Sequence, residues 1–500
     1  MTQARKAYER LVQRFERMAV LGEASAMLGW DTSVMMPVGG SAARGDQFAV
    51  LASLSHEMLT APDVGDDLAL AQSEALPDAW QARNLTLMQR AYQRATALPG
   101  SLVEAMARAN TSCEQIWREA RKQSDFSMVS QALTEVVALA REQAQALSPV
   151  LGLSPYDCLM DGFQPGITAA DVTPVFASYR AFLATALPKA EALQGRKQKP
   201  VPLSGPFAAD RQEALCRDLS LRAGLEKDHS RLDRSTHPFC GGIPTDVRIT
   251  TRYDESNFAK SLLGVMHETG HALYERGLPA QWIRQPVGSA AGMAAHESQS
   301  LIIEMQACRS DAWLGWLSHE LAAYFPQEGA ALAPDNLALL WRRVERGFIR
   351  VDADEMTYPA HVMMRFELEQ DLFSGAVQVK DLPERWNSAM QDFLAITPPD
   401  DAQGVLQDIH WYNGLFGYFP SYTLGAMAAA QLMQAARQAD SAIDTALAQG
   451  DLSPLLRWLR THVHGHASFY GFNDLMRAAT GKPLTPEAFT DHIKRRYLDA

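Results

Sequence analysis

The chain has 500 residues, of which 47% are apolar and 21% charged, and 46 Lys and Arg against 58 Asp and Glu give a formal net charge of −12. This composition is typical of a soluble globular protein and excludes collagen-like, low-complexity and largely disordered chains. Because the chain is acidic and its basic residues are dispersed, it has no positively charged patch that would bind nucleic acid, and anionic lipid would repel it. We therefore expect neither nucleic acid nor membrane as a partner.

The cysteines and the N-terminus predict the cellular compartment. Five cysteines, an odd number without a C-x-x-C spacing, make a disulfide framework improbable. The first seventeen residues are charged throughout and lack the apolar core of a signal peptide. The most apolar stretch, residues 422–436, is interrupted by Gly and Gln and is too short to span a bilayer. The sequence therefore predicts a cytoplasmic protein.

Most of the chain has the pattern of amphipathic helix. Apolar residues recur at three- and four-residue spacing in segments rich in Ala, Leu, Gln and Arg, most clearly in residues 4–27, 102–122, 128–147 and 337–350. Residues 195–206, with three prolines and a basic cluster, are expected to form a solvated loop. The clearest strand is Asp246–Tyr253, in which β-branched and aromatic residues alternate with polar ones.

These patterns predict a mainly α fold with one small antiparallel β-sheet. We find no internal repeat and no long disordered linker, and the segments that carry chemistry extend from the middle to the late part of the chain. Residues 1–500 are therefore expected to form a single domain, which could have two lobes around a shared groove. Ligand sites commonly lie in such grooves.

The sequence His267-Glu268-Thr269-Gly270-His271 matches the H-E-x-x-H motif inside the predicted helix 256–276. At about 100° per residue, the two imidazoles lie about 40° apart and point to the same side of the helix. Such a pair can hold Zn²⁺, and Glu268 lies on the same side without ligating it. Chance would produce the motif in roughly 2 of every 100 such chains, and the histidines would then be structural.

A catalytic zinc needs a third protein ligand, for which Glu297 is the best candidate. It opens a second predicted helix, residues 297–314, and a crossing helix is the usual way to deliver this glutamate. Glu304 lies on the same face of that helix and is a competitor, whereas Glu275 would have to bend back along its own helix. His296 diverges by about 100° from Glu297 and is expected to support the site or to be structural.

The ligand set His267, His271 and Glu297 leaves a fourth position to water, whose pKa Zn²⁺ lowers. Glu268 is then the expected general base, which later passes the proton to the leaving amine. The strand Asp246–Tyr253 is expected to form a sheet edge that pairs with an extended peptide substrate.

Six short motifs occur in chain order: His237-Pro238-Phe239; Asp246-Val247-Arg248-Ile249-Thr250; His267-Glu268-Thr269-Gly270-His271; His296-Glu297-Ser298-Gln299; Ile349-Arg350-Val351-Asp352-Ala353-Asp354; and Gly404-Val405-Leu406-Gln407-Asp408-Ile409-His410-Trp411. Together with Trp30-Asp31 near the N-terminus, they resemble the M32 family of metallocarboxypeptidases. The resemblance extends from about residue 28 to the C-terminal region.

The resemblance implies a large, helical, saddle-like body with a deep central groove and one catalytic Zn²⁺ per chain, for which Co²⁺ substitutes. It also implies a homodimer that removes single C-terminal residues from peptides with a free C-terminus, with broad preference and poor action at proline. The metal ligands of the family correspond to His267, His271 and Glu297, and its catalytic glutamate to Glu268. These positions agree with the assignment from helix geometry.

A carboxypeptidase must bind a free α-carboxylate, for which the planar guanidinium of arginine is best suited. Arg350 is the leading candidate, in a stretch rich in carboxylates; a structural ion pair with one of them is an equal alternative. Arg248 is second, and because Asp246 shares its strand face, a structural ion pair is the stronger interpretation there.

The oxyanion that forms at the scissile carbonyl needs a donor besides the metal. Tyr422 and Tyr418 are candidates, with buried core tyrosines as the alternative interpretation. His237 and His410 are expected either to line the groove or to brace it through hydrogen bonds.

Two other functions fit parts of this pattern. A zinc endopeptidase or oligopeptidase of similar helical architecture also uses H-E-x-x-H with a distant glutamate, and it would cleave a peptide whose C-terminus is amidated. A catalytically silent helical binding protein would retain the motif without metal, and Glu268→Gln would not change its behaviour.

Overall fold

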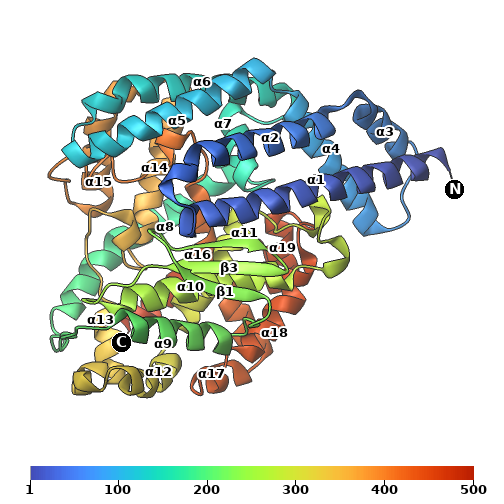
Figure 1. Ribbon diagram of the computed structural model, residues 1–500. Helices are drawn as coiled ribbons and strands as arrows, with labels where there is room; N and C mark the ends of the chain where they lie inside the picture. The colour runs from blue at the N-terminus through green and yellow to red at the C-terminus, as the bar shows by residue number, and fades with distance from the viewer. Residues whose placement is uncertain (1, 500) are drawn as a thin grey trace.

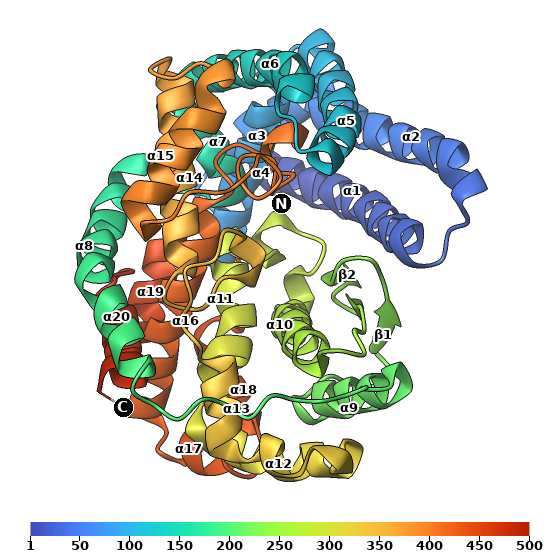
Figure 2. The same cartoon turned by 90° about the vertical axis from the view of Figure 1, so that its left-hand side faces the viewer.

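The computed structural model describes residues 2–499, which form a mainly helical body with one small sheet (Figures 1 and 2). The part of the chain before the sheet contains nine α-helices: α1 Gln3–Val34, α2 Ser41–Thr60, α3 Pro62–Gln72, α4 Ala79–Thr96, α5 Gly100–Gln123, α6 Ser127–Leu151, α7 Pro155–Phe163, α8 Ala169–Gln194 and α9 Ala209–Arg222. The strands are β1 Ser230–Arg234, β2 Phe239–Ile243 and β3 Asp246–Thr251.

The rest of the described chain adds eleven α-helices. They are α10 Phe258–Gly277, α11 Met293–Leu301, α12 Asp311–Tyr324, α13 Pro334–Trp341, α14 Tyr358–Ser374, α15 Leu382–Leu394, α16 Pro420–Ala439, α17 Ala442–Leu447, α18 Ser453–His462, α19 Phe472–Thr480 and α20 Glu487–Ile493. The prediction of a mainly helical fold is thus confirmed. Among residues 2–499, no helix is both long and apolar enough to cross a bilayer.

Three of the four clearest predicted helices lie within the bounds of α1, α5 and α6, whereas the fourth is wrong after its first five residues. That segment, 337–350, leaves the helix after Trp341. The reason is that side chains capture its backbone: the amide of Val344 donates to Gln194, and the amide of Glu345 donates to Asp354. Gln194 is 150 residues away from Val344, and Asp354 lies nine residues after Glu345.

The sheet is mixed, so the prediction of an antiparallel sheet is wrong for one of its two strand pairs. β2 and β3 form an antiparallel hairpin, but β1 pairs with β3 in parallel, in the order β1-β3-β2. After β1 the chain crosses to β2, and β3 returns between them. Because β3 is the middle strand, its backbone is hydrogen-bonded on both sides, and the prediction that it forms a substrate-binding edge is wrong as well.

The N-terminal helices form a layer with an apolar core of their own. Side chains from α1, α3 and α4, including Leu11, Leu68 and Met88, pack into a cluster separate from the main core. In Figure 1, α1 runs directly above the sheet. At that contact the Trp30 ring lies 4.8 Å from the guanidinium of Arg231 and 4.3 Å from that of Arg248. The layer is thereby fixed to the strands that precede α10.

Candidate active site

The helix α10 carries the H-E-x-x-H residues. Its N-terminus is capped by Asn257, whose side chain accepts a hydrogen bond from the amide of Ala259. His267 and His271 lie one turn apart, and the centroids of their rings are 5.0 Å apart. Glu268 lies between them in sequence and is 7% exposed.

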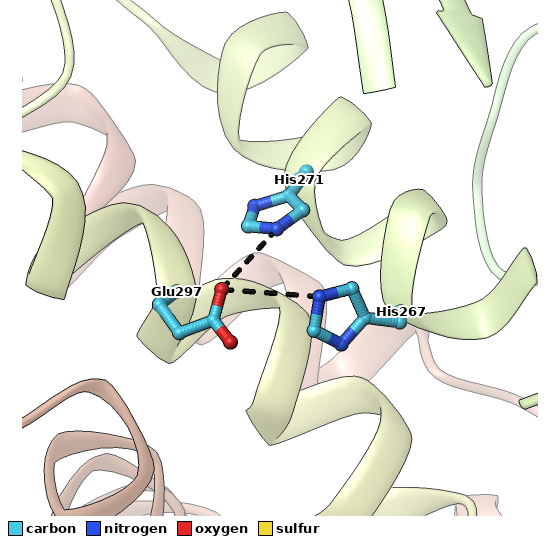
Figure 3. Close-up of side chains that lie close together, drawn as sticks. All are labelled: His267, His271 and Glu297. Carbon is cyan, nitrogen blue, oxygen red and sulfur yellow. Dashed lines mark ion pairs between the residues drawn. The ribbon is translucent and has the colours of Figure 1, made fainter. Parts of the chain in front are cut away.

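The carboxylate of Glu297 faces both imidazoles from the neighbouring helix α11 (Figure 3). Its Oε2 lies 3.8 Å from Nε2 of His267 and 3.5 Å from Nε2 of His271. One donor atom from each residue lies within 4.8 Å of the others, and this is the one such group of three found among residues 2–499. The predicted set of three is therefore brought together in the fold.

Two glycines allow the helices to approach closely enough to form this group. A Cβ atom on Gly270 of α10 would overlap the backbone of Gln299 and Ser300 on α11. On the other side of α11, a Cβ on Gly425 of α16 would lie 2.7 Å from Cβ of Glu297. α11 is thus held between α10 and α16, and its backbone fixes the carboxylate that faces the histidines.

The other nitrogen of His267 is bound by Glu304. Nδ1 of His267 lies 3.1 Å from Oε2 of Glu304, and Arg309 donates to the second oxygen of this carboxylate. Glu304 belongs to a π-helical segment, Ile302–Ala307, that follows α11. Glu304 is therefore not a third ligand here but supports a histidine from behind, as carboxylates commonly do at metal sites.

The continuous helix predicted over 297–314 is consequently wrong. α11 ends at Leu301, the π-helical segment follows, and α12 starts a new helix at Asp311. Ser310 caps α12 by accepting from the amide of Trp313, which marks a helix start. π-Helical segments occur frequently at functional sites, where they direct one side chain inward.

His271 is supported by a second histidine instead of a carboxylate. Nδ1 of His271 lies 2.6 Å from Nδ1 of His296, and Nε2 of His296 lies 2.9 Å from Oε1 of Glu275. Glu275, considered from sequence as a competing ligand, thus lies two side chains away from the Glu297 carboxylate. The expected supporting position of His296 agrees with this geometry.

The environment of the site shifts the pKa values of Glu268 and Glu297 in opposite directions. Burial, together with the nearby carboxylates of Glu297 and Glu304, raises the pKa of Glu268 to about 7. Burial would also raise the pKa of Glu297, but His267 and His271 outweigh it and lower this pKa to about 2. Glu297 is thus a stable anion, whereas Glu268 can take up and release a proton near neutral pH.

Arg350 lies in a buried cluster with a partner that is distant in sequence. Its Nη2 and Nε lie 2.8 and 3.0 Å from the carboxylate oxygens of Asp408, and Nη2 of Arg365 lies 2.6 Å from the same carboxylate. The two guanidiniums hold the pKa of Asp408 far below its usual range although burial opposes this. The cluster thus contains two cations, Arg350 and Arg365, and one anion, Asp408. Its net positive charge is buried, since Arg350 is 5% exposed.

The tyrosine and histidine candidates lie around Arg350. The guanidinium of Arg350 lies 4.8 Å from the centre of the Tyr422 ring, and the Tyr418 ring is 5.1 Å from that of Tyr422. Nε2 of His410 lies 3.1 Å from the Tyr422 hydroxyl. Burial and the charge of Glu297 raise the pKa of Tyr418 to about 12, so its phenol keeps its proton. Tyr422 lies one turn before Gly425 on α16, and Gly425 packs against Glu297, so this group lies near the three candidate ligands.

Two predicted residues lie apart from this arrangement. Arg248 forms the ion pair with Asp246 that its strand position suggested, at 2.6 Å, in addition to its stacking on Trp30. The side chain of His237 is exposed in the turn between β1 and β2, and among residues 2–499 its ring has no hydrogen-bond partner. The structure therefore does not join either residue to the candidate ligands.

Sequence reasoning missed three residues of the Arg350 cluster. Asp408 and Arg365 form its ion pairs, and the hydroxyl of Tyr358 lies 3.3 Å from Nη1 of Arg350. Asp408 belongs to one of the six quoted motifs, so a signal for it existed. Arg365 and Tyr358 lie in an ordinary helical pattern, which gives no signal that they belong to a site.

Comparisons with known proteins identify the family. The family described as "Carboxypeptidase Taq (M32) metallopeptidase" matches residues 10–497. The chain belongs to the M32 family of metallocarboxypeptidases. Thermostable carboxypeptidase 1 of Thermus thermophilus is 35% identical over 98% of both chains, and carboxypeptidase 1 of Bacillus subtilis is 32% identical over 96% of both.

Solved structures of M32 enzymes share the fold. Metallocarboxypeptidase 1 of Trypanosoma cruzi superposes with a TM-score of 0.96 at 38% identity, covering 99% of this chain and 100% of its own. The M32 carboxypeptidase of Deinococcus radiodurans gives 0.94 at 32% identity, with 99% of both chains covered. This M32 chain is therefore a peptide hydrolase of the carboxypeptidase class, and its family implies a metal cofactor. Two imidazoles and a carboxylate that face one another are a donor set that fits a divalent metal ion.

Proposed function

We propose that this protein is a zinc-dependent carboxypeptidase that releases single C-terminal residues from peptides. The observation that carries the proposal is the group formed by His267, His271 and Glu297, with the protonatable carboxyl of Glu268 beside it. The buried, positively charged cluster of Arg350, Arg365 and Asp408 contacts Tyr422 on α16, the helix whose Gly425 packs against Glu297. A metal ligand set, a base and a carboxylate receptor are the parts that such a reaction needs.

His267, His271 and Glu297 would hold the metal, one Zn²⁺ per chain, with Co²⁺ as an effective substitute. Two imidazoles and one carboxylate are the three-ligand set of catalytic zinc sites. When bound, the ion polarises the scissile carbonyl and makes a water molecule more acidic. No fourth His, Cys, Asp or Glu among residues 2–499 joins the group, so a coordination position would remain for water.

Glu268 would act as the general base. Its buried carboxylate, on the helix that carries both histidines, would accept a proton from the attacking water and then donate it to the leaving amine. Tyr422 and Tyr418 would donate hydrogen bonds to the oxyanion, since both phenols keep their protons at neutral pH. His410, hydrogen-bonded to Tyr422, would orient it.

Arg350 would bind the α-carboxylate of the substrate. Asp408 occupies one edge of its guanidinium, while Nη1 points to the phenol of Tyr358 and has no carboxylate partner among residues 2–499. The cluster of Arg350, Arg365 and Asp408 carries one positive charge in excess, and a substrate carboxylate would neutralise it. Arg248, paired with Asp246, is better explained as a structural residue, and the exposed ring of His237 has no hydrogen bond among residues 2–499 that supports a role in the site.

The broader properties that we propose follow from the family resemblance. They are broad preference for the C-terminal side chain, poor action at proline, and a homodimer built from single-domain chains. We also propose a cytoplasmic location, which the five free cysteines favour because secreted proteins usually pair theirs.

Mass spectrometry of one peptide in two forms tests the proposal. With a free C-terminus, the peptide should shorten one residue at a time in the presence of Zn²⁺, and chelation should stop the reaction. With an amidated C-terminus, it should remain intact because Arg350 has no carboxylate to bind. Internal cleavage of the amidated peptide would instead identify an endopeptidase, and no cleavage of either form would leave a silent binding protein.

A further inference from the structure

A chain of hydrogen-bonded side chains leads away from the nitrogen of His271 that is not directed at Glu297. His296 lies 2.6 Å from that nitrogen, and its own second nitrogen lies 2.9 Å from Glu275. The three side chains are shielded from solvent, with exposed fractions of 13% for His271, 18% for His296 and 28% for Glu275. His271 is thus connected to a carboxylate only through a second imidazole.

The direction of each hydrogen bond follows from elementary chemistry. A neutral imidazole carries one proton, so it donates with one nitrogen and accepts with the other. An ionised carboxylate only accepts, so Nε2 of His296 donates to Glu275. Nδ1 of His296 therefore accepts a hydrogen bond, and Nδ1 of His271 carries the proton and donates this bond. Nε2 of His271, 3.5 Å from Glu297, keeps the free lone pair that a metal needs.

The reverse arrangement would prevent metal binding. If Nδ1 of His296 donated to His271, the single proton of a neutral His271 would have to lie on Nε2. The nitrogen that faces Glu297 would then have no lone pair to offer a metal. In a neutral His296, the carboxylate of Glu275 opposes this arrangement because it holds the single proton on the opposite nitrogen.

The two candidate metal ligands on α10 therefore have different supports. His267 is bound directly by Glu304, which Arg309 holds in place. His271 is bound by the imidazole of His296, and Glu275 acts on it from one residue further away. The two supports share no side chain, so their effects on the site should be independent.

We propose that Glu275 and His296 are positioning residues that hold His271 in the tautomer able to bind a metal. This inference rests on the proposed function, since it takes His271 to be a metal ligand. It adds that His296 sets the proton position on His271, and that Glu275 acts on His271 only through His296.

The zinc dissociation constant, measured by competition with a chromogenic chelator, tests this relay. His296→Ala removes the acceptor for His271 and should raise the Kd for Zn²⁺ about 10- to 100-fold. His296→Asn places an amide oxygen where Nδ1 stood and should recover part of this loss. Glu275→Gln replaces the carboxylate by an amide that can either donate or accept, and should raise the Kd about 10-fold.

Double variants distinguish a relay from two separate effects. Because Glu275 acts through His296, adding Glu275→Gln to His296→Ala should leave the Kd at the value of His296→Ala alone. Adding Glu304→Gln to His296→Ala should instead multiply the two losses, since Glu304 belongs to the separate support of His267.

His464→Asn is the matched control. His464 is a buried histidine at the same junction, hydrogen-bonded to Gln299 and packed on Tyr274, but it binds no candidate metal ligand. This variant should keep the wild-type Kd, and the visible spectrum of its Co²⁺ form should match that of the wild type. His296→Ala should shift that spectrum, because the coordination of Co²⁺ would change.

The possible outcomes separate the relay from the proposed function. If the wild type binds one Zn²⁺ and trims peptides, but His296→Ala and Glu275→Gln keep its Kd, the relay is wrong and the function stands. Multiplying losses in the double variant His296→Ala/Glu275→Gln, or a loss in His464→Asn equal to that in His296→Asn, would overturn the relay too. A wild type that binds no metal would overturn both.

Discussion

Gly425 of α16 lies so close to Glu297 of α11 that a Cβ atom on it would be 2.7 Å from Cβ of Glu297. α16 therefore presses on the backbone that carries the candidate metal ligand. Gly425→Ala should displace Glu297, weaken zinc binding and destabilise the protein by about 1–3 kcal/mol, as overpacking commonly does.

Gly315→Ala is the matched control for this prediction. Gly315 lies within α12, and a Cβ atom there would meet nothing within 4 Å. That substitution should raise the free energy of unfolding by about 0.5–1 kcal/mol without changing zinc affinity. Equal zinc affinity in the two alanine variants would show that Gly425 does not position Glu297.

Arg350 is expected to govern the affinity for the substrate. Arg350→Lys keeps the positive charge but loses the planar guanidinium, so the KM for a free-ended peptide should rise about 10- to 100-fold. Arg180→Lys, which changes an exposed arginine paired with Glu367, should leave KM unchanged. Steady-state kinetics that give the same KM for Arg350→Lys as for the wild type would exclude Arg350 as the carboxylate receptor.

Asp408 is expected to be among the most sensitive buried residues. Asp408→Asn leaves Arg350 and Arg365 without their shared anion, which should lower the free energy of unfolding by about 3–5 kcal/mol. Asp474→Asn removes one member of an exposed ion pair with Arg477 and should cost about 1 kcal/mol or less. Denaturant titration measures the free energy of unfolding of both variants. Equal decreases in the two variants would contradict the prediction that Asp408 neutralises buried charge.

The buried carboxyl of Glu369 should make stability depend on pH. Burial raises its pKa to about 7 although Tyr156, Trp411 and the amide of Gly417 donate hydrogen bonds to it. Between the unfolded value of about 4.5 and this pKa, the folded state binds more protons than the unfolded state. This group should therefore make the free energy of unfolding fall as pH rises from about 4.5 to about 7.

A variant isolates this contribution. Glu369→Gln cannot titrate, so its free energy of unfolding should fall less between pH 5 and pH 7.5 than that of the wild type, by up to about 3 kcal/mol. Denaturant unfolding at the two pH values measures both slopes. Equal slopes for the two proteins would show that Glu369 does not keep its proton on folding.

Local patterns in the sequence predicted that the three candidate ligands would lie close together. His267 and His271 are one helical turn apart, so helix geometry alone places both imidazoles on one side. Glu297 was found because a third ligand must come from another helix, and the fold brings it to 3.5 Å from Nε2 of His271. The helices α1, α5 and α6 were predicted for a similar reason, since apolar periodicity is a local property.

Features that depend on distant partners were not predictable in this way. The parallel pairing of β1 with β3 is set by the path of the chain across the sheet, which periodicity does not encode. Asp408 pairs with Arg350 from 58 residues away, whereas the sequence directed attention to the nearer carboxylates of Asp352, Asp354 and Glu355. The π-helical segment that carries Glu304 interrupts an apolar pattern that favours a continuous helix.

The most direct test of the proposed chemistry is to measure zinc content and peptide trimming together in Glu268→Gln. Glu268 is not among the three residues whose donor atoms converge, so this variant should retain one Zn²⁺ per chain. Without the base, kcat for a free-ended peptide should fall about 10²- to 10⁴-fold. A Glu268→Gln protein that binds zinc fully and trims the peptide at the wild-type rate would contradict the assignment of Glu268 as the general base.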